Sequence, residues 1–209
     1  MKKITIAMVI ALIAMGVCKA QEPLRWGVKT GINVSTEGGH ANYSAGFHVG
    51  ALVEYQFFNN ILLLGELLLT RKGFDNTGFY SFTDPENGII GGQEYDIRKR
   101  SYYLELPVHA GYSFEFTQSI ALKLSAGPYI AVGLWGKTKD EDGDFRHTLY
   151  RHGKGDRRFD IGIGGKAMLE FSNHYQLSVG YDYGFIKTNN KDYFGDRNKN
   201  VTVSIAYIF

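Results

Sequence analysis

The chain of 209 residues carries 23 Lys+Arg against 21 Asp+Glu, so its net charge of +2 gives no long-range reason to expect nucleic acid as a partner. Its one cysteine, Cys18, excludes an internal disulfide. Mean hydropathy is −0.20, and no apolar run after the N-terminal segment approaches the roughly 18 residues of a membrane helix. Helical membrane spanning is therefore excluded.

The N-terminus predicts an export signal. Lys2 and Lys3 precede an uninterrupted apolar run over 4–17, and small residues stand three and one positions before Gln21. This arrangement is typical of a signal peptide, and the segment is too short for a stable anchor. We therefore expect residues 1–20 to be cleaved, leaving one domain over residues 21–209.

Cys18 also raises the alternative of a lipoprotein. Lipid attachment requires a small residue just before the cysteine and a Leu-like residue three before it, whereas this chain has Val17 and Met15. The motif is a poor fit, and cleavage without lipid is favoured. The leader removes three lysines, so the mature chain has 23 − 3 = 20 basic groups against 21 acidic ones.

The rest of the chain alternates apolar and polar residues with a period of two. In the first segment Val28, Ile32 and Val34 share one face, while Lys29 and Asn33 share the other. Such alternation over about ten residues indicates strands rather than helices. The alternating segments are 26–34, 46–57, 63–72, 102–114, 120–134, 159–171, 175–185 and 201–209.

The predicted connections alternate in length. Segments 58–60, 115–119 and 172–174 are expected to be tight turns, whereas the connections 35–44, 73–97, 137–157 and 187–198 are expected to be long polar loops. Short turns at one end and long loops at the other are typical of membrane barrels. The predicted fold is all-β: an eight-stranded antiparallel transmembrane β-barrel with short periplasmic turns and long extracellular loops.

The distribution of charges decides which face meets lipid. Basic groups facing hydrocarbon at mid-depth would cost about 2–4 kcal/mol each. The charged parity must therefore face the lumen, where small residues relieve crowding and opposite charges pair. Two aromatic belts, one at each end of the apolar face, support this assignment. The expected lumen ion network is Lys29, Glu66, Glu105, Lys123, Lys166 and Asp182.

This network is expected to plug the barrel, with Glu66 and Glu105 paired to Lys29 or Lys166. A proton or ion path, or a carboxylate pair for acid–base catalysis, is the competing interpretation.

His48 and His109 also point inward, but no Ser–His–acid group can be assembled at the rim, so no enzyme activity is predicted. The acidic run 140–144 lacks the glycine position and closing Glu of a calcium loop, and neither metal nor cofactor is predicted.

Several short motifs carry a family resemblance. They are Glu66-Leu67-Leu68-Leu69-Thr70-Arg71-Lys72-Gly73, Tyr103-Leu104-Glu105-Leu106-Pro107, Ala126-Gly127-Pro128-Tyr129, Phe159-Asp160-Ile161-Gly162 and Tyr207-Ile208-Phe209. Together they resemble the PorT-like outer-membrane β-barrel family over nearly all of the mature chain. The resemblance implies an eight-stranded barrel but no particular activity, although the founding member serves a protein-secretion and gliding apparatus.

Two further groups of residues suggest partners. Ile205, Tyr207 and Phe209 share a face at the C-terminus and look like the signal read by the barrel-assembly machinery, although they also complete the lipid face. A basic cluster lies in the connection 137–157 and just after it. It could hold the phosphates of lipopolysaccharide, and the competing interpretation is ordinary solvated loop charge. That cluster is Arg146, Arg151, Lys154, Arg157 and Arg158.

The sequence thus predicts a barrel in the outer membrane of a Gram-negative bacterium, with its N-terminus in the periplasm. Its expected partners are membrane lipid, lipopolysaccharide, the assembly machinery and a surface or secretion partner. The favoured function is a structural or cell-surface interaction role. The alternatives are a component of a secretion or envelope-assembly machine, and a narrow pore or lipid-modifying enzyme.

Overall fold

A computed structural model gives the fold of most of the chain. The described residues are 24–37, 42–57, 60–83, 90–139, 147–148, 157–187 and 197–209. The predicted signal peptide, 1–20, and the acidic run 140–144 lie outside them. No helix among the described residues has the length and apolar character needed to cross a membrane.

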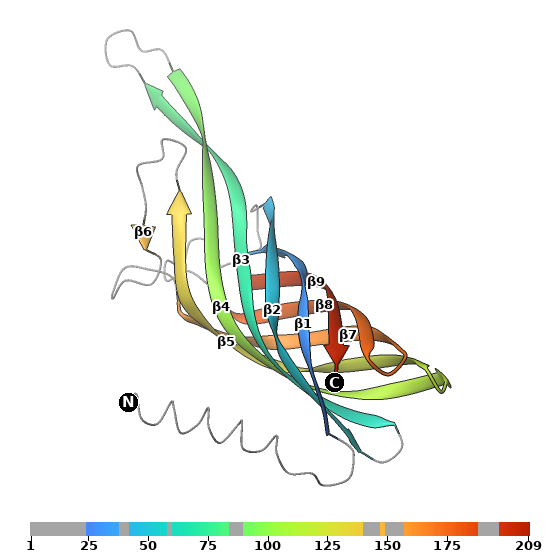
Figure 1. Ribbon diagram of the computed structural model, residues 1–209. Helices are drawn as coiled ribbons and strands as arrows, with labels where there is room; N and C mark the ends of the chain where they lie inside the picture. Colours follow the sequence, from blue (N-terminus) through green and yellow to red (C-terminus); the bar gives the residue numbers. More distant parts are fainter. Residues whose placement is uncertain are drawn as a thin grey trace, which may run out of the picture.

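The described part of the chain is built from strands (Figure 1). In chain order they are β1 (Leu24–Thr36), β2 (Asn42–Phe57), β3 (Ile61–Thr83), β4 (Ile90–Thr117), β5 (Ile120–Lys139), β6 (His147–Thr148), β7 (Phe159–Phe171), β8 (Tyr175–Lys187) and β9 (Arg197–Ile208).

Strand pairing closes the sheet into a barrel. The hydrogen-bonded order is β4-β3-β2-β1-β9-β8-β7-β5, and β5 pairs again with β4. Neighbouring strands are antiparallel, and the seam between the first and last strands runs from Gly27↔Ile208 to Thr36↔Lys199. The two-residue β6 lies against the end of β5 and takes no part in closure. The predicted fold, a closed eight-stranded antiparallel barrel, is confirmed.

Burial alternates along the strands as the sequence pattern predicts. In β7 every second residue from Asp160 to Glu170 is buried, while Phe159, Ile161 and Ile163 between them are exposed. The same alternation leaves large apolar side chains exposed on strands all around the barrel. An exposed apolar surface of this extent requires an apolar surrounding, and a lipid bilayer supplies one.

One end of the barrel carries tight turns. The three residues 172–174 join β7 to β8, and His174 N donates to Phe171 O at 3.1 Å. The two residues inside this turn, Ser172 and Asn173, have φ of 51° and 61°, the left-handed conformation of a type I′ turn. Gln118 and Ser119 join β4 to β5 in a similarly short connection. The chain enters β1 and leaves β9 at this same end, where Phe209 N donates to Trp26 O at 2.9 Å. We call it the short-turn end.

The opposite, long-loop end departs from the prediction in one respect. Segment 73–97 was expected to be a polar loop, but β3 and β4 continue pairing beyond the barrel, from Asn76↔Ile97 to Thr83↔Ile90. In Figure 1 this hairpin rises well above the other strands. The prediction was wrong because the polar composition of the segment was taken as the absence of a strand, whereas backbone pairing between two strands requires no apolar face.

A β-bulge interrupts the β4–β5 pairing near the long-loop end. Tyr102 pairs with Trp135 and Tyr103 with Gly133, so Leu134 is the extra residue. The bulge shifts the alternation of β5 by one position, and Leu134, Trp135 and Lys137 are all exposed while Gly136 is buried. Without it, Trp135 and Lys137 would face the lumen.

Candidate functional site

The barrel lumen holds the predicted charged residues, arranged in successive layers. Nearest the short-turn end, Lys123 Nζ lies 2.5 Å from Glu54 Oε1 and 2.6 Å from Glu170 Oε2. Arg25 Nη1 reaches the same two carboxylates at 3.3 and 2.9 Å. Gln176 Nε2 donates to both, at 3.2 and 2.8 Å. Two cations thus balance two carboxylates in a network that joins β1, β2, β5, β7 and β8 across the lumen.

An apolar layer follows, which the sequence analysis did not anticipate. Along β7, Met168 stands between the network residue Glu170 and Lys166, and Leu52 precedes Glu54 by two residues on β2. The cluster is fully inward and water-excluded, with each member at most 2% exposed: Leu52, Leu62, Leu64, Met168 and Ile208. Apolar side chains on the charged parity make part of the lumen resemble the core of a soluble protein.

The middle of the lumen is centred on Glu66. Its Oε1 accepts from Lys29 Nζ at 2.9 Å, and its other oxygen pairs with Lys166. All three side chains are at most 4% exposed. Asp182 lies in the same region and accepts from Asn200 Nδ2 at 3.2 Å. Lys29, Lys166 and Asp182 line a cavity of only about 10 Å³, close to the space of one water molecule.

Glu105 has a different partner from the one predicted. It forms an ion pair with Lys72, not with Lys29 or Lys166, and Thr70 Oγ1 donates to its Oε2 at 2.9 Å. The register Leu68↔Glu105 explains the difference, because Thr70 and Lys72 follow on the neighbouring strand, whereas Lys29 and Lys166 belong to β1 and β7. Parity alone identifies an inward carboxylate but not the lysine that can reach it.

Aromatic rings and further polar contacts continue toward the long-loop end. Lys72 Nζ lies 5.3 Å from the centroid of the Tyr129 ring, within cation–π range. The Tyr129 hydroxyl donates to Asp160 Oδ2 at 3.0 Å, and Asn198 Nδ2 donates to the same oxygen at 2.8 Å. Lys99 and Glu37 form an ion pair at 2.7 Å.

Glycines make room for the long lumen side chains. A Cβ built on Gly162 would lie 2.6 Å from Cε1 of Tyr129, and one on Gly180 would lie 3.0 Å from Cγ of Lys166. Both distances are shorter than ordinary carbon–carbon contact. The predicted relief of crowding by small residues is therefore visible at these two positions.

The two inward histidines are buried in the lumen. His48 Nε2 lies 2.8 Å from Ser204 Oγ, but the two residues are only 1% and 2% exposed. His109 is 0% exposed, and neither ring nitrogen has a hydrogen-bond partner among the described residues. In the described part of the chain, no group of three His, Cys, Asp or Glu side chains could hold a metal ion.

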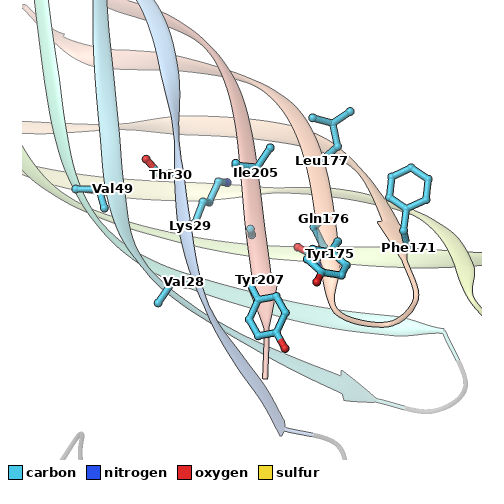
Figure 2. Close-up of a pocket in the computed structure, with 11 residues that line it drawn as sticks. Val28, Lys29, Thr30, Val49, Phe171, Tyr175, Gln176, Leu177, Ile205 and Tyr207 are labelled. Atoms are coloured by element: carbon cyan, nitrogen blue, oxygen red, sulfur yellow. The ribbon is translucent and has the colours of Figure 1, made fainter.

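The outer face carries a shallow apolar concavity of about 530 Å³ near the short-turn end. Figure 2 shows the side chains that line it, including Val28, Leu177, Ile205 and Tyr207, on strands β1, β8 and β9. The hydroxyl of Thr30 donates to His48 O at 3.1 Å. This concavity faces the apolar surroundings of the barrel, so acyl chains fit it better than a water-soluble ligand.

The predicted C-terminal signal residues all lie on this outer face. Ile205, Tyr207 and Phe209 are 61%, 39% and 54% exposed. Of the predicted lipopolysaccharide contacts, Arg157 and Arg158 are exposed just before β7. The other three, Arg146, Arg151 and Lys154, lie outside the described residues.

A closed antiparallel barrel with an apolar outer face and a charged interior defines a transmembrane barrel of the outer-membrane class. Residues 19–190 match the family described as outer membrane protein beta-barrel domain, and the chain belongs to this family. The match places it among outer-membrane barrels without singling out PorT-like members. No curated protein matches the chain.

Among solved structures, the chain is similar to Ail, the attachment invasion locus protein of Yersinia pestis, in complex with the heparin analogue sucrose octasulfate. The identity is 18%, the similarity covers 90% of this chain and 100% of that one, and the TM-score is 0.42. The chain is also similar to Neisserial surface protein A. The identity is 16%, the similarity covers 89% of this chain and 97% of that one, and the TM-score is 0.44. These likenesses carry no functional argument, and the fold assignment rests on the strand pairing and the family match.

Proposed function

We propose that this protein is a plugged outer-membrane barrel that presents the β3–β4 hairpin at the cell surface for interaction with a partner. The observation that carries the proposal is the continuation of β3 and β4 beyond the barrel, from Asn76↔Ile97 to Thr83↔Ile90. At about 3.4 Å per residue this extension projects roughly 25 Å.

The orientation follows from the two ends of the barrel. Barrels of this class have short turns on the periplasmic side and longer connections outside. The chain enters and leaves through the short-turn end, so the N-terminus belongs in the periplasm and the hairpin outside the cell. Export by the predicted leader 1–20 is consistent with this arrangement.

The hairpin is suited to pairing with another chain. The pairing of β2 with β3 ends at Asn42↔Asp75, and that of β5 with β4 ends at Arg98↔Lys139. Beyond these points the two strands pair only with each other among the described residues. Their outer edges therefore present backbone donors and acceptors to which an extended segment can add as a strand.

The layered lumen supports a plugged rather than a conducting barrel. An eight-stranded barrel has an interior just wide enough for side chains. Here ion pairs near the short-turn end and around Glu66 are separated by the apolar cluster of Leu52, Leu64 and their neighbours. A narrow pore is the competing function, and a steady ionic current through the purified protein would favour it.

An epitope tag tests the orientation and the display of the hairpin. Inserted between residues 84 and 89, the tag should bind antibody on intact cells. The matched control is the same tag in the turn at Gln118–Ser119, which should bind only after the outer membrane is permeabilised. Labelling of the 118–119 tag alone on intact cells would contradict the proposed orientation.

A role in a secretion or envelope-assembly machine is the alternative that the PorT-like resemblance implies. A stable machine component co-purifies with defined envelope proteins after mild detergent extraction, in a manner that depends on residues 76–97. A surface-interaction protein should instead be recovered alone and should lose partner binding on cells when the hairpin is deleted. For Ile205, Tyr207 and Phe209 we propose recognition by the assembly machinery in addition to their packing role.

A further inference from the structure

The outer face of β3, β4 and β5 carries a group of cations directly beyond the apolar band. We call Arg71, Arg98, Arg100 and Lys137 the basic patch. On β3, Arg71 follows the outward Leu69, and on β4, Arg100 precedes the outward Tyr102 and Leu104. The register brings the patch together: Arg71 pairs with Tyr102, Tyr102 with Trp135, and Arg100 with Lys137.

The patch surrounds an open concavity of about 550 Å³. Its lining comprises the four cations with Tyr102, Trp135 and Gly136. The rings of Tyr102 and Trp135 stack with their centroids 4.9 Å apart and their planes 24° apart. The concavity thus combines a cationic rim with a flat aromatic wall.

The β-bulge at Leu134 creates half of this arrangement. It turns both Trp135 and Lys137 outward, where they join cations from β3 and β4. Bulges are enriched next to functional sites because they re-aim a side chain without changing the rest of the strand. A lumen-facing Lys137 would need a carboxylate partner, whereas the exposed Lys137 is accessible to an anion from the surroundings.

Within the described part of the chain, two cations of the patch, Arg71 and Lys137, have no carboxylate partner. Arg100 binds the Asp75 carboxylate through two contacts, at 2.7 and 3.2 Å, and also donates to Phe74 O at 3.3 Å. Arg71 Nε is shielded from solvent and has no hydrogen-bond partner among the described residues. Of Arg71, Arg100 and Lys137, only Arg100 contacts a carboxylate among the described residues, so these three cations keep a net positive charge.

We propose that the basic patch binds the phosphate of a phosphorylated glycolipid in the membrane leaflet at the long-loop end. The patch sits at the height where the aromatic belt meets the headgroups, which is where lipid phosphates lie. Guanidinium groups bind phosphate through paired hydrogen bonds, and the Tyr102–Trp135 wall can pack against sugar rings and the first acyl carbons. In a Gram-negative cell this glycolipid is of the lipopolysaccharide type, if the orientation proposed above is correct.

This site differs from the one predicted from the sequence. The earlier prediction used the loop cations Arg146, Arg151, Lys154, Arg157 and Arg158. The basic patch instead uses side chains fixed on paired strands and placed at the membrane interface. Arg157 and Arg158 therefore provide a matched control with the same loss of charge.

Binding can be measured on the full mature protein in phosphatidylcholine nanodiscs, independently of its orientation in cells. The chain has two tryptophans, so Trp26→Phe leaves Trp135 as the only indole reporter. Diphosphorylated lipid A is titrated while Trp135 emission is followed, and native mass spectrometry counts bound lipids. The comparison ligands, titrated in the same way, are dephosphorylated lipid A, inorganic phosphate and phosphatidylglycerol.

We expect Arg71→Gln/Lys137→Gln to weaken binding of phosphorylated lipid A by about tenfold or more, since each interfacial cation contributes about a factor of five. Arg157→Gln/Arg158→Gln should change it less than about twofold. Arg71→Lys should retain part of the binding, and heat-shifted gel mobility verifies that each variant is folded.

Three results would overturn the proposal. If Arg71→Gln/Lys137→Gln and Arg157→Gln/Arg158→Gln weakened lipid A binding equally, binding would depend on overall or loop charge and not on the basic patch. Equal affinity for dephosphorylated lipid A or phosphatidylglycerol would exclude recognition of the glycolipid phosphate. Saturation of the patch by inorganic phosphate alone would indicate a free-anion site. Because no arm depends on surface display, a failed epitope-tag experiment and a failed binding experiment remain distinguishable.

Discussion

The indole of Trp26 stacks on the ring of Phe209, with centroids 4.1 Å apart and planes 25° apart. This contact joins the beginning of the first strand to the last residue of the chain. It reinforces the hydrogen bond from Phe209 N to Trp26 O at 2.9 Å. The seam between β1 and β9 is thus fastened at the short-turn end by both a ring pair and a backbone bond.

Phe209→Ala should weaken this seam. Loss of the ring pair is expected to lower the free energy of unfolding by about 1 kcal/mol beyond the loss of apolar contact area. Phe159→Ala is the matched control, because it removes an outward ring from β7, away from the seam. Urea unfolding in vesicles measures both, and an equal loss in the two variants would show that the seam contact contributes nothing specific.

Glu105→Ala should be strongly destabilising. It leaves the buried Lys72 ammonium without its carboxylate, and breaking a buried pair typically costs about 3–5 kcal/mol. The exposed Glu115, also on β4, is the control, and Glu115→Ala should cost about 0–1 kcal/mol. Unfolding in urea, followed by the gel mobility of unheated samples, gives both values.

A double-mutant cycle isolates the pair itself. Adding Lys72→Met to Glu105→Ala should recover part of the lost stability, because it removes the uncompensated charge. The same Lys72→Met change combined with Glu66→Ala should show no comparable recovery, since Glu66 pairs with Lys29 and Lys166. Strict additivity of Glu105→Ala and Lys72→Met would refute the pairing.

In planar bilayers, the purified barrel should show no large, steady channel. This outcome follows from the proposed plug, because side chains can fill an interior of this size and the apolar cluster lies between two charged layers. Replacing Leu64 and Met168 by serine should increase leakage in the same assay, whereas replacing the outward Leu63 and Leu67 should not. A porin-like current through the unmodified protein would end the plugged-barrel proposal.

The β-bulge predicts the position of Trp135. In the Trp26→Phe protein, lipids brominated near the headgroup should quench Trp135 more strongly than lipids brominated near the chain ends, since its ring lies at the interface. Deletion of Leu134 should remove the extra residue and turn Trp135 toward the lumen. Quenching by the shallow lipid should then fall, and unchanged quenching would mean that the strand re-forms its bulge elsewhere.

Much of this fold could be predicted because two-residue alternation reports directly on which face a side chain takes. The inward position of Lys29, Glu66 and Lys166 followed from parity alone. The partner of Glu105 did not, because strand register and tilt decide which lysine can reach it. The bulge at Leu134 was also missed, since one extra residue leaves no mark in a strand whose outward residues stay apolar or aromatic across it.

Two other features were missed for different reasons. The inward leucines and Met168 were not recognised because strong charges on the same parity dominated its interpretation. The β3–β4 extension was assigned to a loop because the composition of 73–97 is polar. The first feature is decided by which side chains meet across the strands, and the second by backbone pairing, and neither can be read from residue types alone.

The apolar layer has a consequence for proton movement. Protons cross proteins by hopping along continuous chains of hydrogen-bonding groups, and the charged layers on either side would each supply part of such a chain. Leu52, Leu62, Leu64, Met168 and Ile208 offer no donor or acceptor in their side chains. Ser178 pairs with Met168 and His109 pairs with Leu64, and both polar side chains are buried. A proton chain between the two charged layers would therefore have to run through this hydroxyl and this imidazole, because the apolar side chains beside them cannot carry it.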